Sequence, residues 1–240
     1  MLNYSIKMQY AWFIWSILLL IIWIVVYVTL RSKESRKEML IVSLWTSLFG
    51  LTEPIFLYEY WTPLSLFDLN LKTGFDIESV LWSFGVGGIV VVLYEFFFKK
   101  GHAAISVHER HAARHRFHLW AVLSVPVTVS ILFLATDLNP IYSSIIALLV
   151  GSLITLYCRP DLKDKMMVSA LLFFGVYFLY FLTLVAAFPG YVESVWNLDA
   201  ISGILVLGIP LEELAFALTF GLYWSSIYEH IKWRKVTIRK

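Results

Sequence analysis

Long apolar runs alternate with short polar segments along the whole chain. Runs of membrane-crossing length fall at 10–30, 39–60, 75–98, 117–136, 141–158, 166–188 and 200–228. They are continuous rather than alternating apolar and polar, which favours helices over an outer-membrane barrel. The pattern therefore predicts an all-α polytopic membrane protein with seven transmembrane helices.

Composition agrees with this interpretation. Of the 240 residues, 60% are hydrophobic and 17% aromatic, which is more apolar surface than a soluble domain can bury. The first run is followed by RSKESRKE (31–38) instead of a small-residue cleavage site, so we interpret it as a retained span. Cys158 is the single cysteine, which excludes an internal disulfide and a multi-cysteine metal site. The net charge of +2 does not indicate a nucleic-acid partner.

The positive charges between the runs are sorted to one side. Segments 31–38, 99–116 and 159–165 and the tail after Glu229 carry 17 of the 19 lysines and arginines. The alternate segments hold only Lys7 and Lys72. By the positive-inside rule we expect the N-terminus outside and the C-terminus in the cytoplasm, in a plasma or inner membrane.

Seven spans with an external N-terminus also describe retinal-binding opsins. An opsin needs a lysine within the last helix for its Schiff base, and span 200–228 contains none. Lys232 lies beyond it, among the charges of the tail. The opsin hypothesis therefore fails.

A shift of 134 residues aligns the two halves of the chain. It places Glu78 on Glu212, Glu59 on Glu193 and Glu95 on Glu229. We interpret the chain as a single membrane domain, 1–240, built from two parallel three-helix units. The units would be 1–100 and 139–240, joined by a basic loop and linking helix at 101–138.

Acidic residues gather near the outer ends of the predicted spans, where a carboxylate must be paired, protonated or functional. The candidate catalytic residues are Glu53, Glu59, Asp76, Glu78, Glu212 and Glu213. Desolvation and mutual repulsion favour a proton on Glu212 or Glu213. In the structural alternative, Glu212 hydrogen-bonds inside the bundle and Glu213 faces water. Glu95 and Glu229 lie near the basic segments and are expected to pair with them at the interface.

Aromatic residues are expected at the same depth in the membrane as these acidic residues. Trp82 follows Glu78 by four residues and Phe216 follows Glu212 by four, so each glutamate has a ring on its own helix face. Rings that face inward could stabilise a cation, whereas an interfacial belt is the other explanation, favoured for Trp61. Pro210 predicts a break before the last span, with residues 199–209 as a separate outer piece.

Three motifs together resemble the membrane-integral lycopene cyclase family. They are EPIFLYEYWTP (53–63), FDIESVLWSFGVGGI (75–89) and IPLEELAFALTF (209–220). In that family each three-helix half tends to close with Pro-x-Glu-Glu. Here the segment 210–213 keeps it, whereas 76–79 reads Asp-Ile-Glu-Ser and keeps one glutamate.

The resemblance implies cofactor-free cyclisation of a linear carotenoid end, as in lycopene, to a β-ring without net redox change. A carboxylic acid protonates the terminal double bond, and a carboxylate removes a proton after ring closure. The acid would be Glu212 or Glu213, with Glu78 or Glu53 as its counterpart. The residues expected to bind substrate are Tyr58, Trp61, Trp82, Pro210 and Phe216. The alternative is a non-catalytic carotenoid- or isoprenoid-lipid-binding protein or subunit, and a homo- or hetero-oligomer is left open.

Two patterns outside the carboxylates also need an interpretation. His108, His111, His115 and His118 are spaced for one helical face, which suits a metal site or, more simply, a basic amphipathic helix on anionic headgroups. A di-iron oxygenase would need about eight histidine ligands, and only His102 and His230 remain to add. GVGG (85–88) predicts close helix packing.

Overall fold

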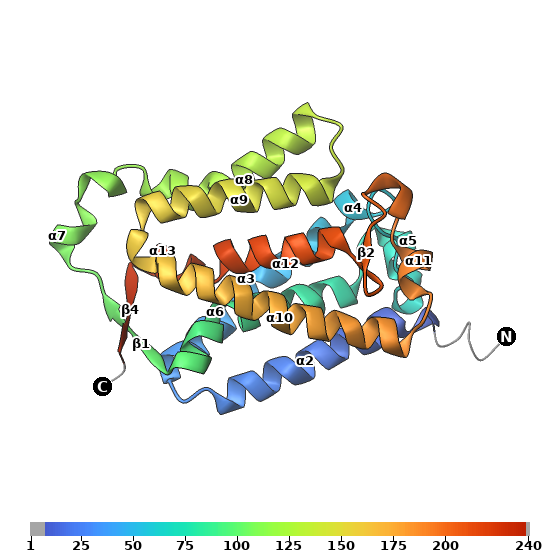
Figure 1. Cartoon of the computed structure of the whole chain (residues 1–240), viewed down its shortest axis with the longest axis horizontal. Helices are drawn as coiled ribbons and strands as arrows, with labels where there is room; N and C mark the ends of the chain where they lie inside the picture. The colour runs from blue at the N-terminus through green and yellow to red at the C-terminus, as the bar shows by residue number, and fades with distance from the viewer. Residues whose placement is uncertain (1–7, 239–240) are drawn as a thin grey trace.

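The computed structural model describes residues 8–238, in which long helices lie side by side (Figure 1). The long helices are α2 Ala11–Thr29, α3 Lys33–Ser47, α6 Ile77–Phe98, α8 His118–Ala135, α9 Pro140–Cys158, α10 Lys163–Ala187 and α12 Leu211–Trp224. The short ones are α4 Glu53–Phe56, α5 Leu69–Thr73, α7 Val107–Arg110, α11 Tyr191–Val195 and α13 Ile227–Lys232. Single 3-10 turns lie at Leu48–Thr52, Leu66–Asp68, Ala113–His115, Pro160–Leu162 and Leu198–Ala200. Within these described residues the protein is therefore all-α apart from two small two-stranded sheets.

Between residues 8 and 238, six segments are long and apolar enough to cross a membrane. They are Ala11–Thr29, Lys33–Phe56, Ile77–Phe98, Ala113–Ala135, Pro140–Cys158 and Pro160–Ala187. The predicted seventh span, 200–228, is not one helix. Its helical part, α12, has 14 residues and is about 21 Å long, short of the ~30 Å hydrocarbon core. The count of seven spans is thus not confirmed, although the break at Pro210 is, because α12 begins at Leu211.

Two groups of three helices make the core. In one group α2 and α3 pack on α6, and in the other α9 and α10 pack on α12. The groups meet where α10 and α12 contact α6. Helix α8 packs on α9 and lies at the edge of the bundle (Figure 1), where only 11% of its apolar window is buried. Apolar residues so exposed fit a lipid surrounding rather than water.

Glycines let α3 and α6 approach closely, as GVGG predicts. A Cβ atom at Gly87 would overlap the side chain of Thr46, and one at Gly88 would overlap Ser43. The indole of Trp23 donates a 2.8 Å hydrogen bond to Ser43 at the same crossing. Small residues therefore fix the distance between α3 and α6 at this crossing.

The two ends of the bundle are built differently (Figure 1). At the basic end, β1 Lys100–Ala104 pairs antiparallel with β4 Arg234–Ile238 and ties the basic loop to the tail. The opposite end carries the hairpin of β2 Leu205–Val206 and β3 Ile209–Pro210, in which β3 contacts α10 and α12. This hairpin falls in the separate outer piece predicted for 199–209.

The predicted single helical face of His108–His118 is wrong. Helix α7 ends at Arg110, a 3-10 turn covers Ala113–His115, and α8 begins at His118. The backbone turns between these pieces, so His108 and His111 are exposed whereas His115 is buried. Helical spacing fails here because the segment is not one helix.

Candidate functional site

Three acidic residues that belong to the helix group of α2, α3 and α6 meet at the end of the bundle opposite the basic end. Glu53 begins α4 just before Pro54, and Asp76 is the N-cap of α6. Ser79 joins them, because its hydroxyl donates to Glu53 Oε2 (2.8 Å) and its backbone amide donates to Asp76 Oδ1 (2.6 Å). Both acidic side chains are at most 5% exposed. Their other oxygens, Oε1 and Oδ2, have no hydrogen-bond partner.

Glu78 lies in the same cluster and is fully buried. Its Oε1 accepts a 2.7 Å hydrogen bond from the amide of Leu66, which pins the loop between α4 and α6. Its Oε2 has no hydrogen-bond partner. Carboxyl groups buried together repel one another when they are ionised. We call Glu53, Asp76 and Glu78 the acid cluster.

Glu213 has a contrasting environment on α12. Its Oε1 accepts from the phenol of Tyr60 (2.7 Å) and the indole of Trp196 (3.0 Å), and its Oε2 accepts from the phenol of Tyr177 (2.5 Å). The residue is 7% exposed. Burial outweighs these three donors and raises the pKa of Glu213, although each donor by itself favours the ionised carboxylate.

Glu212 points to a different neighbour. Its Oε1 accepts from Tyr142 of α9 (2.7 Å) and from the amide of Ser202 (2.9 Å), which anchors the loop before the hairpin. The alternative in which Glu213 faces water is therefore wrong, because both glutamates are buried. Glu212 holds the hairpin, and Glu213 faces the centre of the bundle.

A cluster of aromatic rings connects the acid cluster with Glu213. Trp61 packs on Trp12 and on Trp196, with ring centroids 4.8 and 5.4 Å apart. Trp82 packs on Trp12, Tyr177 and Phe216 at 6.2 to 6.5 Å. On the acid side, the indoles of Trp12 and Trp61 lie near the carboxyl groups of Asp76 and Glu53 without forming a hydrogen bond to them. We call Trp12, Trp61, Trp82, Trp196, Tyr177 and Phe216 the aromatic wall.

The predicted substrate-binding residues do not all lie at one place in the structure. Trp61, Trp82 and Phe216 belong to the aromatic wall, and Pro210 is buried directly before α12. Tyr58 is 64% exposed, and Glu59 is exposed beside it. These last two residues lie outside the wall and the acid cluster.

Sequence reasoning missed the donors that surround Glu213, together with Trp12 and Ser79. The apolar and acidic patterns of the sequence did not single out Tyr60, Trp196 or Tyr177. The signal available was a hydroxyl or an indole N–H inside a span, because such a group needs a buried acceptor. This signal shows which residue in a span needs a hydrogen-bond acceptor, but it does not show which residue is that acceptor.

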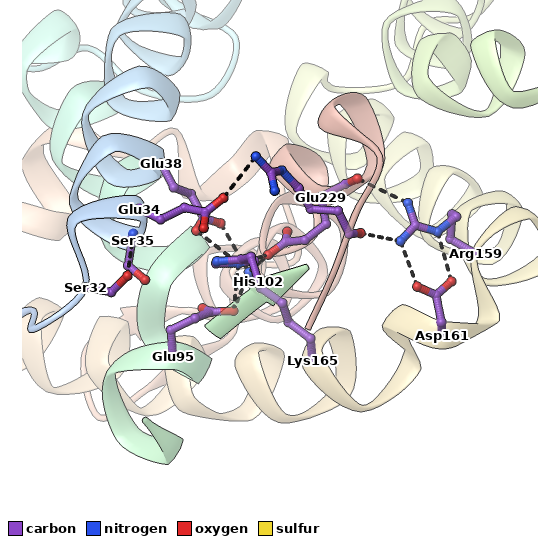
Figure 2. A network of polar contacts seen from close by, with 11 residues as sticks. Ser32, Glu34, Ser35, Glu38, Glu95, His102, Arg159, Asp161, Lys165 and Glu229 are labelled. Carbon is purple, nitrogen blue, oxygen red and sulfur yellow. Dashed lines mark hydrogen bonds and ion pairs between the residues drawn. The ribbon is translucent and has the colours of Figure 1, made fainter. Parts of the chain in front are cut away.

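A second buried network occupies the basic end (Figure 2). Lys165 Nζ lies 2.5 Å from Glu229, 3.0 Å from Glu95 and 3.2 Å from Glu38. His102 Nε2 lies 2.7 Å from Glu229 and 3.3 Å from Glu38. Glu95 and Glu229 do pair with basic residues, as predicted, but both are buried rather than interfacial.

Charge pairing sets the ionisation of this network. Burial alone lowers the pKa of His102, but hydrogen bonds to Glu229 and Glu95 and the charge of Glu38 outweigh it and raise the pKa to about 10. Burial alone raises the pKa of Glu229, but Lys165 and His102 outweigh it and lower the pKa to about 2. Two cations thus hold three carboxyl groups together.

In the part of the chain that the structure describes, two sets of side chains have the spacing of metal ligands. Glu38, His102 and Glu229 form one, but the ammonium of Lys165 already supplies its cation. His115, His118 and Cys158 form the other. His108 and His111 take no part in either set.

Residues 139–231 match the family model described as Lycopene cyclase. This match confirms the resemblance over the second half of the chain, including Glu212, Glu213 and Pro210. No curated protein and no solved structure matches the chain.

Proposed function

We propose that this chain is a membrane-embedded cyclase that closes one end of a linear carotenoid such as lycopene into a β-ring. One observation carries the proposal. Glu213, a buried acceptor of three hydrogen bonds, lies at the same end of the bundle as the buried acid cluster, and contacting rings run from its donor Trp196 through Trp61 to Trp12. The match to the lycopene cyclase family supports this substrate class.

The two carboxyl environments suit opposite steps. The acid cluster of Glu53, Asp76 and Glu78 donates a proton to the terminal double bond, and the resulting carbocation is attacked by the neighbouring double bond. Glu213 removes one proton from the closed ring. One proton enters and one leaves, so the product is an isomer with no net redox change. This assignment reverses the one favoured from sequence, where Glu212 or Glu213 was the acid.

The aromatic wall supplies what the cation needs between those steps. Indole faces stabilise a desolvated cation by about 2 kcal/mol each, and packed rings exclude the water that would quench it. The rings of Trp12 and Trp61 are in contact, so a polyene end must part them to reach Glu53. We therefore expect the wall to open from the lipid side when substrate enters.

The proposed orientation follows from the charges. The basic end faces the cytoplasm, which places the acid cluster and Glu213 toward the outer leaflet. The carotenoid would enter from the bilayer, its only reservoir. The protein would act as an intramolecular lyase without a cofactor.

Pigment analysis in a lycopene-accumulating host tests the proposal. The wild type is expected to form γ- or β-carotene, and Glu53→Gln and Glu213→Gln are expected to lower conversion about 100-fold or more. Glu193→Gln, an exposed position, is the matched control and should keep wild-type conversion. Unchanged lycopene with folded wild-type protein in the membrane would overturn cyclisation. Co-purified carotenoid without conversion would instead identify a binding protein.

A further inference from the structure

Three ligand-type side chains from distant parts of the chain meet at the basic end. His115 comes from the turn before α8, His118 begins α8, and Cys158 ends α9. The Sγ atom of Cys158 lies 3.4 Å from His115 Nδ1 and 3.6 Å from His118 Nδ1. His115 and Cys158 are at most 6% exposed. The three atoms thus form a tight group inside the protein.

These distances are those of ligands around one tetrahedral metal ion. With a metal–sulfur bond of about 2.3 Å and a metal–nitrogen bond of about 2.0–2.1 Å, tetrahedral angles place sulfur and nitrogen ~3.6 Å apart. The sulfur-to-nitrogen distances in the protein already have that value. All three atoms lie within 4.8 Å of one another, so one ion could reach them together.

A fourth histidine points to a ligand independently. His230, on α13, is 1% exposed, and neither of its ring nitrogens has a hydrogen-bond partner. Its ring packs edge-on against His118 with centroids 4.5 Å apart. A buried imidazole without partners is costly, and a metal bond to one ring nitrogen would remove that cost.

The surroundings would hold such a site in place. Trp233 stacks on His118 with ring centroids 3.8 Å apart and meets the ring of His115 edge-on. Arg159, the residue after Cys158, is paired with Asp161 at 2.7 Å. A thiolate at Cys158 would further balance the positive charge of Arg159. Arg114 Nε lies 3.4 Å from His115 Nε2, a contact that metal binding through Nδ1 would release.

We propose that His115, His118 and Cys158 bind one divalent transition-metal ion of the zinc class, and that the adjacent His230, which is not among the three side chains grouped within 4.8 Å, turns toward the ion as fourth donor. Imidazole and thiolate ligands select zinc-like ions over magnesium or calcium. The thiol proton of Cys158 is released as the metal–sulfur bond forms, and the histidines bind as neutral rings.

The ion would join the basic loop, α9 and α13 rather than take part in ring closure. Cys158 and Tyr142 lie sixteen residues apart on α9, so the metal site is about 24 Å from the level of Glu212. Its expected effect is therefore on the stability of the basic end. The inference stands whether or not the chain is a cyclase, because its ligands are distinct from the acid cluster and Glu213.

Cobalt substitution of the full-length protein in detergent tests this inference. Stripped wild-type protein titrated with Co²⁺ should take up one ion per chain and develop a thiolate-to-cobalt charge-transfer band. Cys158→Ser should abolish the band, and His118→Gln and His230→Gln should weaken Co²⁺ binding at least 10-fold. The control His108→Gln, His111→Gln double variant should bind as the wild type does.

A second measurement does not depend on variants that fold. Because Cys158 is the only cysteine, thiol alkylation followed by mass spectrometry reports on this site alone. Zn²⁺ should protect the thiol and a chelator should restore its reactivity. Folded wild-type protein without the cobalt band, or a thiol that Zn²⁺ does not protect, would overturn the site. Loss of binding in the His108, His111 variant would do so as well, since it would place the ion on the exposed loop.

Discussion

Tyr60 and Glu213 are 153 residues apart in the chain, and the phenol of Tyr60 donates a 2.7 Å hydrogen bond to the carboxylate. Tyr60 follows α4 in the first helix group, and Glu213 lies on α12 in the second. The bond therefore joins the two groups at the depth where the acid cluster and aromatic wall also lie. It makes the state of Glu213 depend on how the groups pack.

Removing this donor should weaken the proposed base. Tyr60→Phe leaves Tyr177 and Trp196 on Glu213 but removes a hydrogen bond to a charged group, worth about 1.5–3 kcal/mol. We expect conversion of lycopene to fall roughly 10-fold or more, with the protein still folded. Tyr157→Phe, at a position 76% exposed, is the control. Equal activity of the two variants would show that Tyr60 does not support the reaction.

Ser79 should matter through Glu53. Ser79→Ala removes the hydroxyl that donates to Glu53 Oε2 but keeps the backbone amide that caps α6 through Asp76. We expect normal helix content with lower conversion, because a freed carboxyl can rotate away from the substrate. Circular dichroism and pigment analysis measure the two effects. Ser130→Ala, whose exposed hydroxyl bonds only its own helix, should change neither.

Replacing Lys165 should lower the stability of the protein strongly. Lys165→Met leaves Glu38, Glu95 and Glu229 buried around a lost cation, and breaking such a group costs about 3–5 kcal/mol. Thermal unfolding in detergent should show a large drop in Tm. The neighbouring exposed Lys163→Met should unfold close to the wild type. Similar Tm values for the two variants would contradict a structural role for the network.

Because of His102, the thermal stability of the protein should fall as the pH rises into the alkaline range. Its pKa is raised from 6.5 to about 10 in the folded protein, so its charge contributes fully below about pH 6.5. That contribution is lost as pH rises toward 10. Wild-type Tm should therefore fall more steeply between pH 7 and 10 than that of His102→Gln. Parallel curves would show that His102 is not charged in the network, and His108→Gln should follow the wild type.

The crossing of α3 and α6 should not accept a methyl group at Gly87. Its Cβ would overlap Thr46, so Gly87→Ala should lower stability by about 1–3 kcal/mol through overpacking. Gly175→Ala is the matched control, because nothing lies within 4 Å of a Cβ there. That change should be neutral or slightly stabilising, since alanine is the better helix former. Chemical or thermal unfolding of both variants in detergent decides between these outcomes.

The division of the chain into helices was readable from the sequence. A continuous apolar run in lipid must satisfy its own backbone hydrogen bonds, so runs such as 75–98 and 141–158 become helices wherever they pack. Pro210 and GVGG were equally local signals, and both hold in the structure. The Pro-x-Glu-Glu segment also carried the family resemblance, which the match over residues 139–231 confirms. The internal duplication and the orientation stay predictions.

Which polar groups meet was decided only by the tertiary structure. Helices that are apolar all round carry almost no face signal, so the sequence could not say that Glu213 faces Tyr60 or that Lys165 lies between Glu95 and Glu229. Where a helix breaks, as after Arg110, the spacing of residues along the sequence no longer predicts which side chains meet. His115 therefore contacts Cys158 and not His111. Local chemistry determines the elements, whereas partners from distant helices determine what each buried side chain can do.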